Sequence, residues 1–180
     1  MRLPHLAVTV ATGLFAVAAP VHGQAGASRT LELAAGLDAE HTFDGGTFAP
    51  GFTGQLAISW RGETHPLGAR VGVFGFHRRG TADTRMRVYG VEGLGTYALA
   101  ATPSHPYLLA GVGLYDYAFR APTGVILGPS ASGYRFAASA GVGVAFPAGR
   151  VQPFLEARLM VFLDDNPLGQ LLPVQVGLRF

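Results

Sequence analysis

Apolar residues recur at every second position along most of this chain, in short segments separated by clusters of Gly, Pro, Asp and Ser. Helical spacing is nowhere sustained. Alternation of this kind predicts β-strands with one apolar and one polar face. The pattern predicts eight strands, over Arg29–His41, Thr53–Arg61, Leu67–Phe76, Arg87–Leu99, Tyr107–Tyr117, Arg135–Phe146, Val151–Phe162 and Leu172–Phe180.

The two faces of a predicted strand differ in chemistry. In the first strand Leu31 and Leu33 share a face, and Glu32 lies on the other. The fourth strand is less regular, because Arg87 falls on its apolar face unless it already belongs to a loop. In the fifth strand Asp116 is assigned to the polar face. The apolar face of that strand then carries Tyr107, Leu109, Tyr115 and Tyr117.

The connections between the strands alternate in length. Short ones are Gly62–Pro66, Ala100–Pro106 and Pro147–Arg150, and longer ones are Thr42–Phe52, His77–Met86, Ala118–Tyr134 and Leu163–Leu171. Membrane barrels pair short periplasmic turns with longer extracellular loops and carry two aromatic girdles. The expected periplasmic girdle is Trp60, Tyr97, Tyr107, Phe146 and Phe180, and the expected outer girdle is Tyr89, Tyr115, Tyr117 and Phe136. A soluble sandwich would alternate too, but it has no reason to sort aromatic residues to both rims.

The predicted inward face carries charges of both signs. An eight-stranded barrel has an interior just filled by side chains, so buried charges there need partners and are expected to form a hydrated salt-bridge network. Its predicted members are Glu32, Asp38, Arg61, Arg70, Glu92, Asp116, Glu156, Arg158 and Arg179, with Glu40 and Arg135 as further candidates.

Composition agrees with a membrane protein of one domain. The chain has 180 residues and no Cys, so disulfides and thiolate metal sites are excluded. Charged residues make up 13%, against about 25% in soluble domains. The net charge of +2 gives no reason to expect nucleic-acid binding. Residues 1–27 predict a cleaved signal peptide, with Arg2, an apolar stretch over Leu6–Ala19 and small residues over Ala25–Ala27, which leaves 28–180 as the barrel domain.

Three segments, Pro106–Gly113, Val151–Arg158 and Leu172–Phe180, resemble the outer-membrane β-barrel domain family of OmpA-like and opacity-type proteins. The resemblance implies an all-β, eight-stranded antiparallel up-and-down transmembrane barrel in the outer membrane. It also implies an assembly signal for the barrel-assembly machinery, formed by Val174, Val176, Leu178 and Phe180. Because the sequence ends there, the periplasmic peptidoglycan-binding domain of longer OmpA proteins is not expected.

Two alternatives to a purely structural role stay open. A narrow channel for ions or small solutes would use Glu92, Glu156 and Arg158 as barrier residues. A lipid A-modifying enzyme would need a His with a Ser and a carboxylate. None of the four mature His residues lies in the His-x-Ser arrangement of the lipid A deacylase family, and they are His41, His65, His77 and His105. We therefore expect no catalytic residues, no cofactor and no metal.

The outer surface offers two candidate contacts. Arg78, Arg79 and Arg85 flank the second long connection, and Arg binds phosphate groups bidentately, so they are candidates for contacts with lipopolysaccharide. The third long connection has an apolar tip at Val125–Leu127 that is available for a surface ligand. The expected function is that of a non-enzymatic outer-membrane protein that contributes to envelope structure, with outer-membrane lipid as its main partner.

Overall fold

The computed structural model describes residues 27–38, 51–62, 65–79, 85–99, 104–120, 131–146, 149–163 and 170–180. These residues form nine strands, β1 (Ala27–Asp38), β2 (Gly51–Gly62), β3 (Leu67–Arg79), β4 (Arg85–Ala98), β5 (His105–Arg120), β6 (Ala131–Ala145), β7 (Gln152–Phe162), β8 (Gln170–Leu171) and β9 (Pro173–Arg179). Within these ranges no helix is long and apolar enough to cross a membrane.

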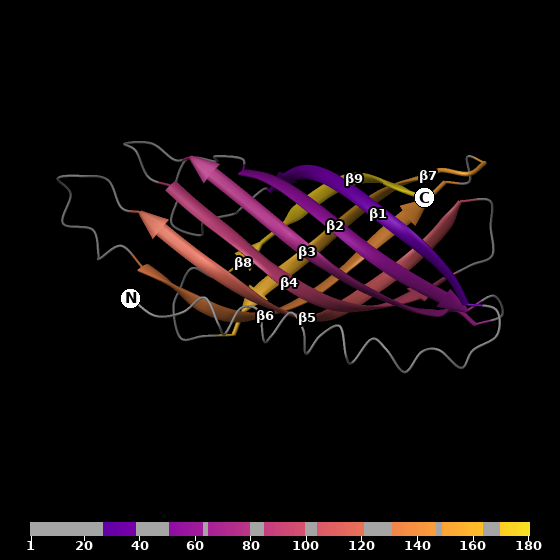
Figure 1. Cartoon of the computed structure of the whole chain (residues 1–180), viewed down its shortest axis with the longest axis horizontal. Coiled ribbons are helices and arrows are strands. Elements are labelled where there is room, and N and C mark those ends of the chain that lie inside the picture. The colour runs from indigo at the N-terminus through magenta and orange to yellow at the C-terminus, as the bar shows by residue number, and fades with distance from the viewer. Residues whose placement is uncertain are drawn as a thin grey trace.

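The strands form one closed antiparallel sheet (Figure 1). Each strand from β1 to β7 pairs with its neighbours in sequence, and β9 joins β7 to β1. β8 and β9 both pair with β7, on either side of Leu172, so the two segments together occupy one strand position of the barrel. The barrel therefore has eight strand positions in up-and-down order, which confirms the predicted fold class.

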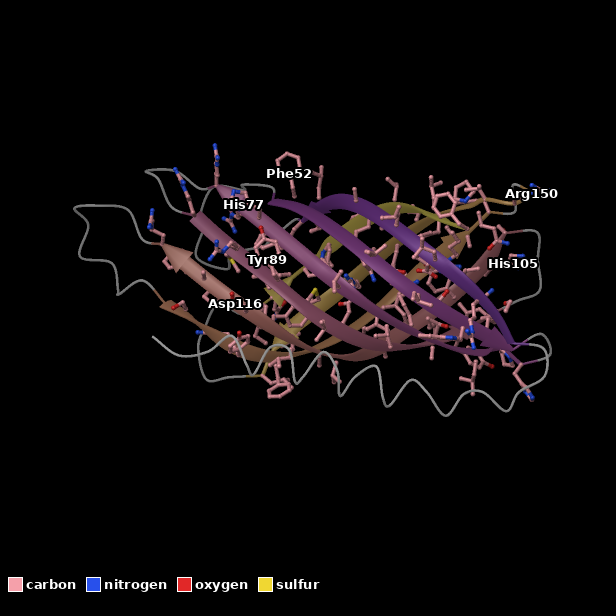
Figure 2. The ribbon with its side chains drawn as sticks, viewed as in Figure 1. Phe52, His77, Tyr89, His105, Asp116 and Arg150 are labelled. Carbon is pink, nitrogen blue, oxygen red and sulfur yellow. The ribbon has the colours of Figure 1, made fainter. Side chains whose placement is uncertain are left out.

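The two ends of the barrel carry different connections. We call one the loop end, where 39–50, 80–84, 121–130 and 163–169 join the strands. The other is the turn end, where 63–66, 99–104 and 146–151 join them, and where Phe180 lies. His77 and Asp116 lie toward the loop end, and His105 and Arg150 lie at the turn end (Figure 2).

Alternation along the strands separates an apolar outer wall from a mixed interior. In β1, Leu31 and Leu33 are exposed while Glu32 is buried. In β7, Leu155 is exposed while Glu156 is buried. The same pattern holds around the barrel, and it follows because successive side chains of a strand point to opposite faces. Arg87 faces outward, as the register of the fourth strand predicted.

The predicted orientation of the fifth strand is wrong. Tyr107, Tyr115 and Tyr117 are fully buried in the interior, whereas Asp116 is exposed on the outer wall. The tyrosines turn inward because two of their hydroxyl groups reach carboxylates there, from Tyr107 to Glu156 and from Tyr115 to Glu92. A tyrosine buried with a partner for its hydroxyl keeps both its apolar contacts and its hydrogen bond. The outer girdle accordingly lacks Tyr115 and Tyr117 and gains Phe52 and Tyr134, and the periplasmic girdle lacks Tyr107.

Several strands extend further toward the loop end than predicted. β3 continues to Arg79 and β4 begins at Arg85, and these two residues lie opposite each other in the ladder. β5 likewise continues to Arg120, opposite Arg85. Pairing satisfies the backbone N–H and C=O groups, so a ladder continues for as long as both strands remain in register. The connection between β3 and β4 is therefore shorter than the sequence pattern indicated.

Candidate functional site

Five interior residues form a connected group that we call the Arg70 cluster, namely Glu32, Arg70, Tyr107, Glu156 and Arg179. Arg70 donates from Nη1 to both oxygens of Glu156 at 3.0 and 2.7 Å. The Arg70 Nε lies 2.9 Å from Glu32 Oε2, and the Arg179 Nε lies 2.9 Å from Glu32 Oε1. Tyr107 donates to Glu156 Oε2 at 2.8 Å. Side chains from five different strands thus meet at one point inside the barrel.

A second group, the Glu92 cluster, lies nearer the loop end and contains Gln55, Glu92, Tyr115 and Arg158. The carboxylate of Glu92 accepts from Arg158 at 2.7 Å, from Gln55 at 2.9 Å and from Tyr115 at 2.8 Å. All four side chains are buried. The charge of every carboxylate in the two clusters is therefore met by arginine, and Glu156 and Glu92 also accept hydrogen bonds from neutral donors.

Aromatic rings cover the buried guanidinium groups. Arg179 lies 4.8 Å from the ring centre of Tyr107 and 4.9 Å from that of Phe154. Arg158 lies 4.8 Å from the ring centre of Phe74. A cation over a ring face is attracted by the ring quadrupole, and the attraction grows when both are removed from water. The rings thus replace part of the hydration that the arginines lose.

Between the Glu92 cluster and the loop end the interior contains a layer of packed apolar side chains. We call this layer the apolar plug, and it consists of Phe76, Met86, Val88, Tyr117, Met160, Phe162 and Leu171, all buried. Tyr117 packs edge-on against Phe162, with ring centres 6.3 Å apart. The charged clusters are therefore separated from the loop end by packed side chains.

Other predicted interior residues lie near the barrel ends. The Asp38 carboxylate accepts from the Leu172 N–H at 2.6 Å at the loop end. Arg61 is half-buried at the turn end. Arg135 lies 4.6 Å from the ring centre of Tyr117. Glu40 lies outside the described residues, and Asp116, as stated above, lies outside the barrel.

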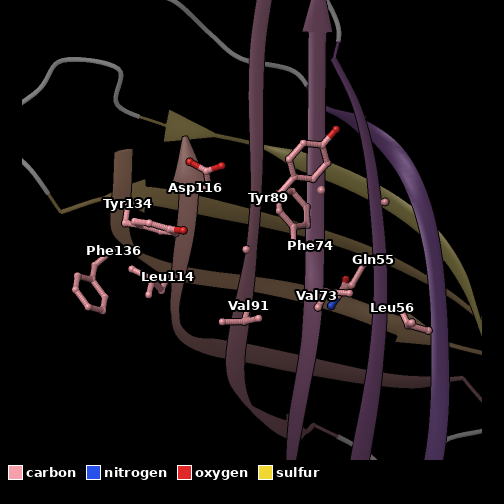
Figure 3. Close-up of a pocket in the computed structure, with 13 residues that line it drawn as sticks. Gln55, Leu56, Val73, Phe74, Tyr89, Val91, Leu114, Asp116, Tyr134 and Phe136 are labelled. Atoms are coloured by element: carbon pink, nitrogen blue, oxygen red, sulfur yellow. The ribbon is translucent and has the colours of Figure 1, made fainter. Parts of the chain in front are cut away.

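A groove of about 870 Å³ crosses the outer wall from β2 to β6 (Figure 3). Two rows of residues that lie directly opposite one another across these strands line it. One row is apolar and consists of Leu56, Val73, Val91, Leu114 and Phe136. The other row, nearer the loop end, consists of Gly54, Gly75, Tyr89, Asp116 and Tyr134. The groove exists because Gly54 and Gly75 place no side chain on the wall, and Asp116 is its one charged residue.

Arginines face outward between this groove and the loop end. Arg79, Arg85 and Arg120 lie directly opposite one another on β3, β4 and β5, and we call them the arginine row. Arg87 lies between the row and the groove, opposite His77. The side chains of all four arginines are exposed.

Arg78 is not part of this row. It shares the inward face of β3 with Phe76, and it lies close enough to Asp38 for their charges to interact. Of the three arginines predicted to meet lipopolysaccharide, only Arg79 and Arg85 therefore face outward. The structure adds Arg120 to these two outward arginines. It was not predicted from the sequence because it lies in what was expected to be a loop.

The described histidines are not assembled into a catalytic group. His105 lies at the turn end and His77 lies near the loop end (Figure 2). His65 is exposed in the connection between β2 and β3. His41 lies outside the described residues. Within those residues no three His, Asp or Glu side chains lie together as a metal site would require.

Sequence reasoning missed Tyr107, Tyr115 and Gln55 as members of the interior clusters. One signal in the sequence pointed to the tyrosines. Gly143 lies opposite Tyr107, and a Cβ on Gly143 would lie 2.3 Å from the Tyr107 ring. A Cβ on Gly113 would similarly lie 2.5 Å from the Tyr115 ring. Glycines on the inward face thus make room for inward rings.

The residues proposed as an assembly signal lie along the outer wall on the final strand. Val174, Val176, Leu178 and Phe180 are all exposed there. The N–H of Phe180 donates to the Leu31 carbonyl, so the last residue is hydrogen-bonded to β1. The segment thus shows a continuous apolar face on one side and buried Gln175 and Arg179 on the other.

Comparisons with known proteins place the fold. No family model matches the chain, and no curated protein matches it. Among solved structures, Neisserial surface protein A matches with a TM-score of 0.65 and 18% identity, over 86% of this chain and 98% of that one. A major outer membrane protein from Thermus thermophilus matches with a TM-score of 0.61 and 15% identity, over 87% and 100%. Ail, the attachment invasion locus protein of Yersinia pestis, matches with a TM-score of 0.53 and 17% identity, over 86% and 97%.

These matches agree with the physical character of the wall. A closed barrel with an apolar outer wall and aromatic residues near both rims is the architecture of outer-membrane proteins. The longer connections of such barrels face the outside and the short turns face the periplasm. On the strength of its architecture, its apolar wall and these neighbours, the chain has the fold of the small eight-stranded barrels of the outer membrane.

Proposed function

We propose that this protein is a non-enzymatic structural component of the outer membrane whose outer wall binds lipopolysaccharide. The observation that carries the proposal is the arginine row. Arg79, Arg85 and Arg120 are exposed and directly opposite one another across three strands. Like charges directly opposite in a sheet destabilise it. An anion between them removes that repulsion, and phosphate suits Arg because its oxygens accept two parallel N–H bonds.

The groove supports a lipid rather than a soluble phosphate as the ligand. It lies on the same strands as the arginine row and its lining is almost wholly apolar. An acyl chain of a lipid whose phosphate meets Arg85 would pass along Val91 and Leu114 on the same wall. Tyr89 and Tyr134 flank Asp116 on the neighbouring strands, at the level where aromatic residues meet lipid headgroups. The hydroxyl and amide groups of a glucosamine headgroup would give the Asp116 carboxylate hydrogen-bond donors.

A variant with Arg79→Gln, Arg85→Gln and Arg120→Gln tests the proposal. We expect it to bind lipopolysaccharide at least about tenfold more weakly than the wild type, because each lost charge-assisted bond is worth about 1.5–3 kcal/mol. The matched control is Arg29→Gln, which removes an exposed arginine of β1 near the turn end. Binding is measured by titrating lipopolysaccharide into the barrel in micelles at fixed ionic strength. Equal affinities of the triple variant and the control would refute the arginine row as the site.

The same samples separate this role from lipid modification. We expect the mass spectrum of lipid A to be unchanged after incubation with the folded barrel, since His77 and His105 lie toward opposite ends of the barrel. A loss of one acyl chain that depends on the folded protein would favour an enzyme instead.

A further inference from the structure

The barrel interior opens at the turn end into a polar pocket of about 290 Å³. Residues from β1, β2, β4, β7 and β9 line it, so it lies at the mouth of the barrel rather than on its wall. Its polar groups include Thr30, Arg61, Thr96, Arg150, Gln152 and Arg179. In a barrel whose short turns face the periplasm, this mouth opens to the periplasm.

The lining carries more positive than negative charge. Its charged side chains are three arginines, Arg61, Arg150 and Arg179, and one acidic residue, Glu32, so the balance of side-chain charges is three minus one, or +2. Glu32 is already engaged, with one oxygen on Arg70 and the other on Arg179, both at 2.9 Å. The positive charges of Arg61 and Arg150 therefore have no second acidic side chain of the lining to meet them.

Arg61 is the clearest case of an unmet charge. Its side chain is half-buried on the inward face of β2 and forms no ion pair with any described residue. It lies close enough to Arg179 and Arg70 for their charges to repel it, and the one carboxylate near enough to attract it, Glu32, is shared with those two arginines. A guanidinium that is held partly out of water beside two others is stabilised by a small anion, since burying a charge without a partner is costly.

The neutral groups of the pocket add donors that suit an oxyanion. Thr96 lies on the inward face of β4, and Gln152 lies at the start of β7. Thr30 and Ser59 share a hydrogen bond of 2.6 Å, in which one hydroxyl hydrogen stays available to another acceptor. Gly68 keeps the space beside Thr96 open, because a Cβ there would lie 2.6 Å from Thr96 Oγ1.

We propose that this turn-end pocket binds a small oxyanion of phosphate size, held between Arg61 and Arg179, with Arg150 at the entrance. Arg forks and hydroxyl donors together are the groups that bind phosphate oxygens. The proposal is independent of the arginine row, which lies on the outside of the opposite end. Its ligand chemistry is a phosphate group, either free in the periplasm or on a phospholipid headgroup of the inner leaflet.

The test titrates inorganic phosphate into the folded barrel in a phosphate-free, non-ionic micelle, with sodium chloride added to constant ionic strength. The arginine side-chain N–H signals are followed by NMR, and Arg61→Gln identifies the signal of Arg61. We expect saturable shifts of the Arg61 and Arg179 signals in the wild type and at least about tenfold weaker binding in Arg61→Gln. Arg29→Gln, which removes an exposed arginine on the outer face of β1, is the control and should bind as the wild type does.

Thermal unfolding gives a second readout that does not depend on signal assignment. A ligand that binds only the folded barrel raises its unfolding temperature. We expect phosphate to raise that temperature in the wild type and in Arg29→Gln, and to raise it much less in Arg61→Gln. Thr96→Val, which removes one neutral donor and no charge, serves in place of Arg61→Gln if the latter does not fold.

Nanodiscs that contain phosphatidylglycerol distinguish the two sources of phosphate. Shifts of the Arg61 signal with inorganic phosphate support a soluble anion, and shifts only in the anionic nanodiscs support a headgroup. The site is refuted if neither probe gives a saturable response, or if Arg61→Gln responds to both as the wild type does.

Discussion

At the scale of single residues, the interior of this barrel repeats one arrangement twice. Glu156 accepts from an arginine and a tyrosine, and Glu92 does the same with a second arginine and tyrosine. The two tyrosines come from β5, and Arg158 lies two positions from Glu156 on β7. Neighbouring positions of the same strands thus supply opposite charges to different clusters, which fixes the strands relative to one another.

Glu156 is the acceptor on which the Arg70 cluster depends. Glu156→Ala leaves Arg70 buried with one of its two carboxylate partners and leaves the Tyr107 hydroxyl without its acceptor. Removing one partner of a buried ion pair costs about 3–5 kcal/mol. We expect a loss of that size in the free energy of unfolding, measured by urea titration in micelles. Arg29→Ala, which removes an exposed arginine, is the control, and a change of less than about 1 kcal/mol in Glu156→Ala would contradict the cluster.

Asp116 tests the orientation of β5. Because it faces the membrane boundary, we expect Asp116→Leu to stabilise the barrel by up to about 1 kcal/mol, since charge on the lipid face of a barrel is unfavourable by that order near the interface. Had Asp116 been a member of the interior network, the same change would destabilise the barrel. The chain contains no Cys, so Asp116→Cys and Tyr115→Cys can also be compared by labelling with a water-soluble thiol reagent. Faster labelling at position 115 would show that β5 is turned the other way.

At the scale of strands, small residues on β5 and β6 leave the space in which large inward side chains pack. The ring of Tyr107 lies over Gly143 on the neighbouring strand. Gly143→Ala forces that ring away from Glu156, and we expect it to cost about 1–3 kcal/mol, as overpacking of a full interior does. Gly93→Ala is the matched control, because nothing lies within 4 Å of a Cβ at Gly93. Equal stabilities of the two alanine variants by urea titration would mean that Tyr107 has free space around it.

The sequence was sufficient to assign the inward and outward faces of strands whose two faces differ strongly in polarity, and it was insufficient for β5. In β7 the charged residues fall on one face only, and in β1 only Arg29, near the end of the strand, lies on the other face, so the pattern is enough to predict that Glu32 and Glu156 point inward, where both are buried. In β5 both faces are apolar or aromatic, and the one carboxylate, Asp116, suggested the wrong side. The partners that draw Tyr107 and Tyr115 inward come from β7 and β4, far away in sequence, and no local pattern contains them.

A substitution in the final strand can distinguish an effect on assembly into the outer membrane from an effect on the stability of the folded barrel. If Phe180 acts as part of an assembly signal, Phe180→Ala lowers the amount of barrel in the outer membrane of cells. The free energy of unfolding of the refolded protein should change by less than about 1 kcal/mol, because the substitution keeps the backbone bond to Leu31 and alters an exposed side chain. Outer-membrane fractions and urea titrations measure the two effects. A large loss of stability in vitro would assign Phe180 to the fold instead.

At the scale of the whole molecule, the interior is layered along the barrel axis. The turn-end pocket is followed by the Arg70 cluster, then the Glu92 cluster, then the apolar plug. An ion that moves along this axis would first have to break buried ion pairs and then cross a layer of packed rings. The outer wall, by contrast, offers a groove and exposed arginines. The chemistry available to ligands therefore lies at the mouth and on the wall, while the middle of the barrel serves to hold the fold.

This layering argues against the channel alternative. Eight strands enclose only enough space for their own side chains, and here Phe76, Tyr117 and Phe162 fill the layer next to the loop end. We expect no single-channel steps when the refolded barrel is added to planar bilayers, under conditions in which a known porin gives steps. Comparing the conductance of Glu92→Gln with that of the wild type is a more specific test, because Glu92 lies in the middle of the interior. If the wild type conducted and this variant changed the conductance, ions would be passing through the interior, and the packing of the apolar plug would have to open in the membrane.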